Sequence, residues 1–222
     1  MLNDELVLCF PSSLMLEDTD VNDWPAANYR LNTILSTPGL TAFRPRSEVE
    51  KDCNWLQIIP YCFIHPVHDF RRVLVYRRTK KSSESRLNNT YSLGFGGHIN
   101  YSDALQDLHI RAVDSTRIMR TCLQRELDEE IQFERKSETA PVIHIPQRCS
   151  FMLYDSTNEV SKCHLGVIYH MAVRQFDCVT LKDPSLDDLR CLTIDQLKSP
   201  EWDGKLESWA KLLVHKLDTL TA

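Results

Sequence analysis

The chain has 222 residues, of which 42% are hydrophobic, and its net charge is −5. A chain of this length and hydrophobicity can bury a sizeable core, either as one domain or as a domain with an extension. Its acidic balance, without a dominant block of lysine or arginine, argues against general nucleic-acid binding. No window reaches the run of about 18 apolar residues that a membrane span needs.

Eight cysteines are spread along the chain, at positions 9, 53, 62, 122, 149, 163, 178 and 191. They form no Cys-x-x-Cys pair and no zinc-binding spacing, so the pattern predicts buried, reduced thiols of a cytosolic protein. The first apolar stretch contains Asp4 and Glu5 and has the features of neither a signal peptide nor an anchor. These features predict a soluble, cytoplasmic protein without a membrane partner.

The sequence predicts a mixture of strands and helices. In the first half, strands are predicted at residues 6–10, 56–64, 73–77 and 91–99, and helices at 24–35 and 116–131. In the second half, strands are predicted at 149–154, 164–174 and 189–194, followed by an amphipathic helix at 205–217. This order predicts an α/β fold with a sheet between helices.

The predicted helix at 116–131 ends in a dense cluster of charge. Glu126, Glu129 and Glu130 are spaced i, i+3 and i+4, which places them on one face of a helix. Mixed charges at helical spacing most often form a solvated face with ion pairs, so the cluster alone does not define a site. Three carboxylates that act together would need a compensating cation, and oxygen ligands suit Mg²⁺ or Mn²⁺.

A glycine turn lies upstream of this helix. Residues 91–99 predict a strand that runs into Gly96-Gly97, and glycine permits backbone geometry and close ligand approach that other residues do not. A strand, a Gly-Gly turn and a helix with Arg-Glu-x-x-Glu-Glu resemble the Nudix hydrolases. The family motif runs Gly, five residues, Glu, seven residues, Arg-Glu, an aliphatic residue, one residue, Glu-Glu, one residue, Gly and an aliphatic residue. The helix matches almost all of its second half.

The first half of the motif departs from the family. Arg117 stands where the family has its first glutamate, and Arg111 where it has glycine, so Gly97 is the better candidate for the motif glycine. Between Gly97 and Arg125 lie 27 residues where the motif allows 13, which implies an insertion of 14. Gln132 replaces the glycine that usually ends the helix, so the sequence specifies this end less sharply.

A second resemblance covers the segment before the glycine turn. Residues 43–50 and 55–61 are similar to the lead-in of a bacterial subgroup of MutT-like phosphoesterases, which also carries Gly-Gly-His-Ile and a lengthened connection. The two resemblances imply the Nudix fold, an α/β/α sandwich with a mixed β-sheet between helices. Residues 55–222 would form this domain, with residues 1–54 as an N-terminal extension packed on it.

The resemblance also implies a metal-dependent hydrolase that cleaves a pyrophosphate linkage in a nucleoside diphosphate linked to another group. Glu126, Glu129 and Glu130 would hold Mg²⁺ or Mn²⁺, and the backbone carbonyl of Gly96 would add a ligand. Glu129, Glu130 and Arg125 are the expected catalytic residues, with Arg125 orienting the carboxylates.

Two roles are left open by the sequence. The missing glutamate would be replaced by Asp103, Asp107 or Asp114, or by nothing, in which case metal affinity is reduced or catalysis is lost. The general base would be a motif glutamate, Glu159 or Asp183, although the last two fit better as ordinary loop acids.

Arg44, Arg46 and His98 are the candidate substrate-binding residues. Paired arginines can grip a phosphate in a bidentate way. Their spacing from Glu48 and Glu50 favours ion pairs in a helical turn instead. His98 either touches a phosphate from the glycine turn or is a polar residue at a strand end.

Two functions therefore follow from the sequence. The leading one is a hydrolase of a small nucleotide-like diphosphate, and the alternative is a catalytically weak Nudix-fold protein that binds a nucleotide or a partner as a regulator. The intact glutamates favour the first, whereas the missing motif positions and the insertion favour the second. The identity of the substrate and the oligomeric state stay open, although a homodimer is common in the family.

Overall fold

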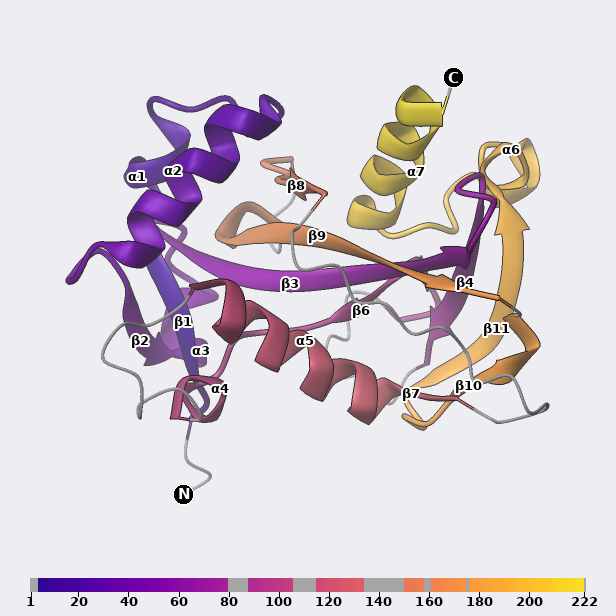
Figure 1. Ribbon diagram of the computed structural model, residues 1–222, viewed down its shortest axis with the longest axis horizontal. Coiled ribbons are helices and arrows are strands. Elements are labelled where there is room, and N and C mark those ends of the chain that lie inside the picture. Colours follow the sequence, from indigo (N-terminus) through magenta and orange to yellow (C-terminus); the bar gives the residue numbers. More distant parts are fainter. Residues whose placement is uncertain are drawn as a thin grey trace. The chain divides into compact units, whose positions relative to one another are not determined.

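The apolar run after residue 54 forms strand β3 (Trp55–Pro66), whose interior is buried from end to end. A continuous apolar run, rather than an alternating one, is typical of a strand covered on both faces. In the computed structural model the described residues are 4–79, 88–105, 115–133, 150–157, 161–174 and 176–221. Figure 1 shows the course of the chain through its helices and strands.

The chain divides into two compact units, each assembled from separate parts of the sequence. Unit 1 consists of Met1–Tyr61, Gly96–Gln124 and Gln147–Tyr169, and unit 2 of Cys62–Phe95, Arg125–Pro146 and His170–Ala222. Strand β3, strand β9 (His164–Val173) and helix α5 (Ser115–Glu130) each continue from one unit into the other. The predicted division after residue 54 stays a prediction.

Unit 1 contains a sheet with strand order β2 (Ala42–Pro45), β1 (Leu6–Pro11), β3, β9 and β8 (Phe151–Leu153), and β6 (Gly94–Gly96) also pairs with β3. Strands β1 and β3 pair antiparallel, with Cys9 opposite Gln57. Helix α2 (Trp24–Ser36) buries Ala27, Leu31 and Ile34, which its helical spacing places on one face. Within this unit, α2 and the first half of α5 lie on opposite sides of the strands (Figure 1). The short elements are α1 (Ser13–Leu16), α3 (Arg46–Val49), α4 (Tyr101–Leu105) and the 3₁₀ turn η2 (Ser161–Cys163).

Unit 2 is built around strand β4 (Arg72–Arg78), which lies between β11 (Leu186–Thr193) and β5 (Tyr91–Ser92). A second, two-stranded sheet pairs β7 (Ile131–Phe133) with β10 (Val179–Leu181). Helix α7 (Ser208–Thr221) buries an apolar stripe at helical spacing that includes Ala210, Leu213 and Leu217. The remaining elements are α6 (Ile194–Leu197) and the 3₁₀ turns η3 (Phe176–Cys178) and η4 (Pro200–Trp202).

Two predicted elements change where the chain switches partners. The strand predicted at 91–99 is interrupted at Leu93, because β5 pairs with β4 whereas β6 pairs with β3. The helix predicted at 205–217 begins only at Ser208, because the backbone of Lys205 and Glu207 is hydrogen-bonded to Tyr91. In both cases a long-range backbone pairing overrides the local pattern.

The prediction that all cysteines are reduced is wrong for two of them. Cys53 and Cys163 form a disulfide bond within unit 1 across a sequence separation of 110 residues. Cys9, Cys62, Cys122 and Cys178 are buried free thiols, as predicted, and Cys191 is a partly exposed one. Cys149 lies outside the described residues. Spacing alone gave no sign of the bond, because a separation this large carries no information about contact.

The predicted α/β class, with a sheet between helices, is confirmed. Over the part of the chain that the structure describes, no helix combines the length and the apolar composition of a membrane span.

Candidate active site

Helix α5 carries the charged half of the motif. Its apolar residues Ile118, Cys122 and Leu127 are buried, and the polar residues occupy the remaining surface. The helix starts and ends within one residue of the predicted bounds, because its 3.6-residue periodicity is unbroken. The last turn, from Arg125 onward, therefore holds the predicted carboxylates on a regular helix.

Arg125 pairs with two of the three carboxylates. Its Nη1 atom lies 2.7 Å from Oε1 of Glu126 and 3.5 Å from Oε2 of Glu129. The side chain of Glu126 is 15% exposed and that of Glu129 is 60% exposed, so the pair with Glu126 is the better shielded from water. The arginine thus holds Glu126 and supplies part of the positive charge that the crowded acids need.

Glu130 ends the helix and is buried. Its backbone carbonyl accepts a hydrogen bond of 2.8 Å from the backbone N–H of Lys182, and the Lys182 ammonium donates one of 2.5 Å to the carbonyl of Asp128. A cation near the last carbonyls is favourable at a helix C-terminus. The residues after β10 therefore end the helix where the family uses a glycine and this chain has Gln132.

A buried polar group near Glu130 was not predicted. The Tyr76 hydroxyl donates a 2.6 Å hydrogen bond to the carbonyl of Gly94, and Ser92 donates one of 2.5 Å to Glu207. Burial raises the pKa of Tyr76, the charge of Arg78 opposes this, and the charges of Glu130 and Glu207 raise it further. These long-range neighbours in unit 2 share no motif in the sequence.

The three glutamates have suitable chemistry for a hard divalent cation, because carboxylate oxygens are the ligands that Mg²⁺ and Mn²⁺ prefer. Among the residues with a described position, no group of three or more His, Cys, Asp or Glu side chains is gathered closely enough to hold a metal ion. The donor types therefore fit the cation. In the present arrangement Glu126 and Glu129 are paired with Arg125.

Of the acids expected to replace the missing glutamate, only Asp103 has a described position. It is 1% exposed, and its carboxylate accepts a 3.0 Å hydrogen bond from the backbone N–H of Asn100 at the start of α4. Asp107 and Asp114 lie outside the described residues. Arg117, at the family's glutamate position, is exposed on the first part of α5. Asp103 thus serves a local turn within unit 1.

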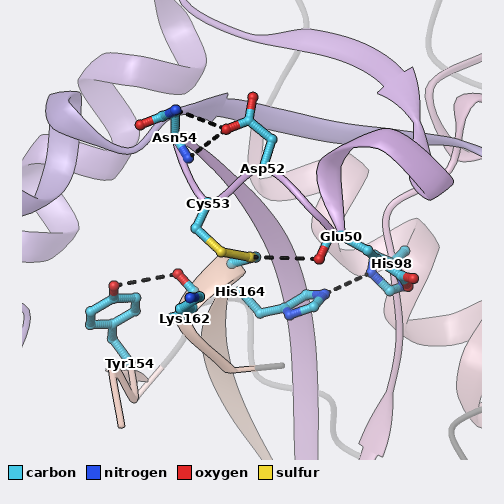
Figure 2. The surroundings of a disulfide bond; sticks show 9 residues. Glu50, Asp52, Cys53, Asn54, His98, Tyr154, Lys162 and His164 are labelled. Atoms are coloured by element: carbon cyan, nitrogen blue, oxygen red, sulfur yellow. Dashed lines mark hydrogen bonds between the residues drawn. A yellow bond between two sulfur atoms is a disulfide. The ribbon is translucent and has the colours of Figure 1, made fainter. Parts of the chain in front are cut away.

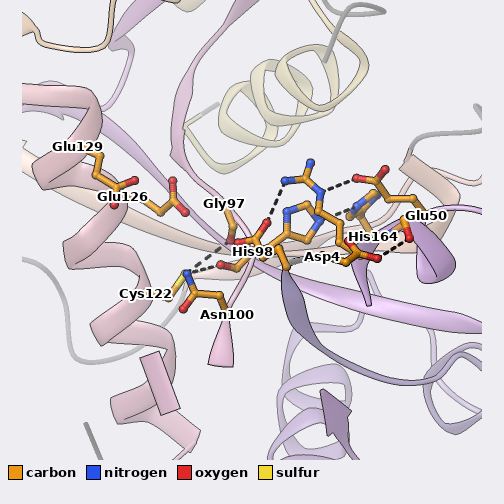
Figure 3. A network of polar contacts seen from close by, with 12 residues as sticks. Asp4, Glu50, Gly97, His98, Asn100, Cys122, Glu126, Glu129 and His164 are labelled. Atoms are coloured by element: carbon orange, nitrogen blue, oxygen red, sulfur yellow. Dashed lines mark hydrogen bonds and ion pairs between the residues drawn. The ribbon is translucent and has the colours of Figure 1, made fainter. Parts of the chain in front are cut away.

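The glycine turn is fixed by close packing in unit 1. Gly96 has φ +150°, and a Cβ atom at this position would lie 2.0 Å from the carbonyl oxygen of Pro60. The Cys122 thiol lies 3.6 Å from the carbonyl of Gly97 and 3.4 Å from that of His98 (Figure 3). Only glycine fits at position 96, and the carbonyls that follow it are contacted by a buried thiol that sequence reasoning did not single out.

His98 is paired with a histidine that the sequence did not indicate. Its Nε2 atom lies 3.1 Å from Nε2 of His164, 66 residues away, and His164 is 8% exposed. One of the two facing nitrogens must carry a proton for this contact to be a hydrogen bond. The role of His98 toward a phosphate stays a prediction.

Arg44 and Arg46 are engaged by acids, which is the arrangement that their spacing favoured. Arg44 lies 3.5 Å from Glu48 and stacks over Trp55 at 4.4 Å, while Arg46 lies 2.6 Å from Glu50. Burial alone would lower the pKa of Arg46, but the hydrogen bond to Glu50 and the nearby acids raise it above its ordinary value. A phosphate-binding role for either arginine stays a prediction.

Of the candidate general bases, Glu159 lies outside the described residues. Asp183 accepts hydrogen bonds of 2.7 Å from both the backbone and the hydroxyl of Ser185. Its own backbone nitrogen lies 3.4 Å from the carbonyl oxygen of Glu130. The structure thus brings Asp183 beside the end of α5, and its role as a base stays a prediction.

The sequence and the fold were compared with those of known proteins. No family model matches the sequence. Protein YmaB of Bacillus subtilis is 28% identical over 173 residues, which cover 78% of this chain and 76% of that protein. Among solved structures, Tm1382, described as a candidate Nudix hydrolase, has a TM-score of 0.67 and 23% identity, covering 97% of this chain and all (100%) of that one.

A Nudix hydrolase from Alicyclobacillus acidocaldarius is more distant, with a TM-score of 0.48 and 13% identity over 73% of this chain and 90% of that one. The structural comparison therefore rests on Tm1382, whose likeness extends over 97% of this chain. At this level of identity the likeness concerns the fold. The chain has the Nudix fold, as its motifs predicted.

Proposed function

We propose that the chain is a divalent-cation-dependent hydrolase that cleaves the pyrophosphate linkage of a small nucleotide-like diphosphate. The observation that carries this proposal is the last turn of α5, where three glutamates and Arg125 occur together in a chain with the Nudix fold. A carboxylate cluster of this kind is suited to hold Mg²⁺ or Mn²⁺. A nucleoside diphosphate linked to a second group is the substrate class that fits the motif.

Each residue of the proposed site has a distinct task. Glu126, Glu129 and Glu130 would hold the cation, and the carbonyl of Gly96 would contribute a further oxygen. The bound cation would neutralise phosphate charge and lower the pKa of a water molecule. Arg125 would orient Glu126 and Glu129, as its present ion pairs with both suggest. Glu129, Glu130 and Arg125 are therefore the proposed catalytic group.

Substrate binding is proposed for the glycine turn and the N-terminal segment. His98 would donate to a phosphate oxygen, and Arg44 and Arg46 would contribute positive charge from the segment around α3. Both arginines already have acidic partners, so their contribution would require them to exchange Glu48 and Glu50 for phosphate. We expect their substitution to affect substrate affinity more than turnover.

A second candidate function is a regulator that binds a nucleotide without hydrolysing it. The observation that favours it is the pairing of Arg125 with two of the carboxylates, together with arginine at position 117 in place of the family glutamate. A regulator of this type would bind a nucleotide in the presence of Mg²⁺ and release it unchanged. Turnover therefore separates the two functions.

The test compares Glu129→Gln and Glu130→Gln with Asp128→Asn. All three changes remove one negative charge from the same helical turn, but Asp128 is outside the proposed ligand set. We expect hydrolysis of a panel of nucleoside diphosphate derivatives to fall about a thousandfold or more in the two glutamine variants, because each loses several kcal/mol of transition-state stabilisation. Asp128→Asn should retain near-normal activity.

Direct binding of Mn²⁺, followed by electron paramagnetic resonance, supplies a readout that does not depend on the substrate. Weakened Mn²⁺ binding in both glutamine variants and unchanged binding in Asp128→Asn would support the proposed ligand set. Full hydrolysis in both glutamine variants would refute it. Nucleotide binding to the native chain without turnover across the panel would favour the regulator.

A further inference from the structure

The disulfide bond between Cys53 and Cys163 joins two segments that are far apart in the sequence (Figure 2). Cys53 lies in the turn that leads into β3, and Cys163 is the last residue of η2, directly before β9. Both residues belong to unit 1. The bond therefore ties the start of β9 to the turn after α3.

The two cysteines differ in their exposure to solvent. Cys53 is partly exposed, whereas Cys163 is 1% exposed. Thiol–disulfide exchange begins with attack of a thiolate on an accessible sulfur, and its rate depends on that access. Cys53 is therefore the sulfur that a small thiol can attack, and Cys163 is the leaving group.

The surroundings also accommodate the reduced form. The Cys163 sulfur lies 3.9 Å from the backbone carbonyl oxygen of Glu50. A disulfide sulfur has no proton to donate, whereas a thiol is a weak donor. Reduction would thus convert an existing contact into a hydrogen bond, so the buried thiol would have an acceptor in place.

The disulfide connects to the glycine turn through a short series of contacts. Cys163 is followed by His164, whose Nε2 atom faces that of His98 at 3.1 Å. The carbonyls of His98 and Gly97 are in turn within 3.6 Å of the Cys122 thiol. All of these residues lie in unit 1. A shift of Cys163 would therefore act on the turn through two side chains.

We propose that Cys53 and Cys163 form a thiol–disulfide modification site whose oxidised form holds His164 against His98 and so fixes the glycine turn. Opening the bond would remove the covalent restraint next to His164, and the turn would become more mobile. An effect on catalysis rests on the proposed function, because it requires that the turn contribute to hydrolysis. The coupling between the disulfide and the turn does not depend on the proposed function.

The reaction requires a dithiol as the reductant. One of its thiolates attacks the Cys53 sulfur, the bond between the two cysteine sulfurs breaks, and Cys163 leaves with the electron pair and takes up a proton. The second thiol of the reductant then attacks the mixed disulfide and releases Cys53, which is protonated in turn. The protein gains two electrons and two protons, and the dithiol is oxidised to its own disulfide.

The first measurement uses the full chain purified without reductant and divided into untreated and dithiothreitol-treated samples. Alkylation and peptide mass analysis report the state of each cysteine, and hydrogen–deuterium exchange reports the mobility of residues 96–100. We expect Cys53 and Cys163 to be protected from alkylation only in the untreated sample, and exchange in the turn to rise severalfold on reduction. Free thiols at both positions in the untreated chain would overturn the proposal.

Two variants then separate the opening of the disulfide from its effect on the glycine turn. In Cys53→Ala, exchange in the turn should match that of the reduced native chain and should not respond to dithiothreitol. In His164→Asn, the disulfide should still form and break, but exchange in the turn should be high in both states. Cys191→Ser, which removes a partly exposed thiol in unit 2, should behave like the native chain.

Equal exchange in the turn of the oxidised and reduced native chain would overturn the coupling, and this comparison needs no variant that might fail to fold. Hydrolysis is measured separately in both redox states. Absence of hydrolysis with a redox-sensitive turn would refute the proposed function and leave this inference standing. Normal hydrolysis, together with exchange in the turn that does not respond to reduction, would support the proposed function and overturn this inference.

Discussion

The glycine turn of unit 1 and the last turn of helix α5 in unit 2 carry the two halves of one motif, but different forces hold them. At the glycine turn the backbone of Gly96 packs directly on Pro60. The disulfide is linked to this turn through His164, which follows Cys163 and contacts His98. At the end of α5 the side chains of Glu126 and Glu129 pair with Arg125, and Lys182 is hydrogen-bonded to the last backbone carbonyls of the helix.

This difference has a consequence for how each region tolerates change. Close packing has little room for adjustment, because a core atom displaced by a fraction of an ångström meets its neighbours. The ion pair of Arg125 with Glu129, whose side chain is 60% exposed, can be rearranged at small cost, since exposed pairs contribute at most about 1 kcal/mol. We therefore expect substitutions at the turn to reduce stability, and substitutions at the end of α5 to alter chemistry while the fold persists.

The largest effect on stability is expected for Gly96→Ala. The new Cβ would meet the Pro60 carbonyl oxygen at 2.0 Å, and the backbone there has φ +150°. Overpacking and backbone strain together should lower the free energy of unfolding by about 3 kcal/mol. Gly39→Ala is the matched control, because Gly39 also has a positive φ, +86°, but open space around its Cβ position. Chemical denaturation should show a loss of only about 1 kcal/mol there; equal losses would mean that packing at the turn is unimportant.

A smaller effect, on chemistry alone, is expected for Arg125→Gln. Loss of the residue that orients Glu126 and Glu129 should reduce hydrolysis by about 10- to 100-fold, with little change in the denaturation midpoint. Arg125→Lys should recover part of the activity, because it keeps the charge but not the planar guanidinium. Mn²⁺ affinity sharpens the comparison: a rise in affinity in Arg125→Gln would show that the arginine competes with the cation instead of positioning its ligands.

The smallest effect is expected from a second histidine pair, which lies in unit 2. Nδ1 of His65 donates to the carbonyl of Pro66 at 2.7 Å, and Nε2 lies 2.9 Å from Nδ1 of His170. Burial lowers the pKa of His65 below its ordinary value of 6.5, although the Pro66 carbonyl and the charge of Asp69 partly oppose this.

The sign of the pH dependence follows from this lowered pKa. As the pH falls below 6.5, His65 takes up a proton in the unfolded chain before it does so in the folded one, so stability should decrease. In His65→Asn the amide can still donate to Pro66, and this part of the decrease should disappear. His215→Asn, an exposed histidine of the same unit, is the control. Urea denaturation between neutral and mildly acidic pH measures the stability of both variants. An unchanged pH dependence in His65→Asn would contradict the assignment of this decrease to His65.

Much of the fold followed from local patterns. The 3.6-residue repeat of α5 predicted both ends of that helix to within one residue, and the spacing of Glu126, Glu129 and Glu130 predicted their common position on its last turn. The apolar run of β3 was equally informative. These features can be predicted because backbone geometry fixes which neighbours in sequence share a face.

The sequence by itself therefore determined the α/β class, the motif helix and its carboxylates. The tertiary structure alone decided the bond between Cys53 and Cys163, the pairing of His98 with His164, and the use of Lys182 in place of a glycine at the end of α5. Each of these joins residues more than 50 positions apart, where no helical or strand period applies. Which of many cysteines, histidines or lysines meet depends on how the sheets are ordered, and that order is set by long-range packing.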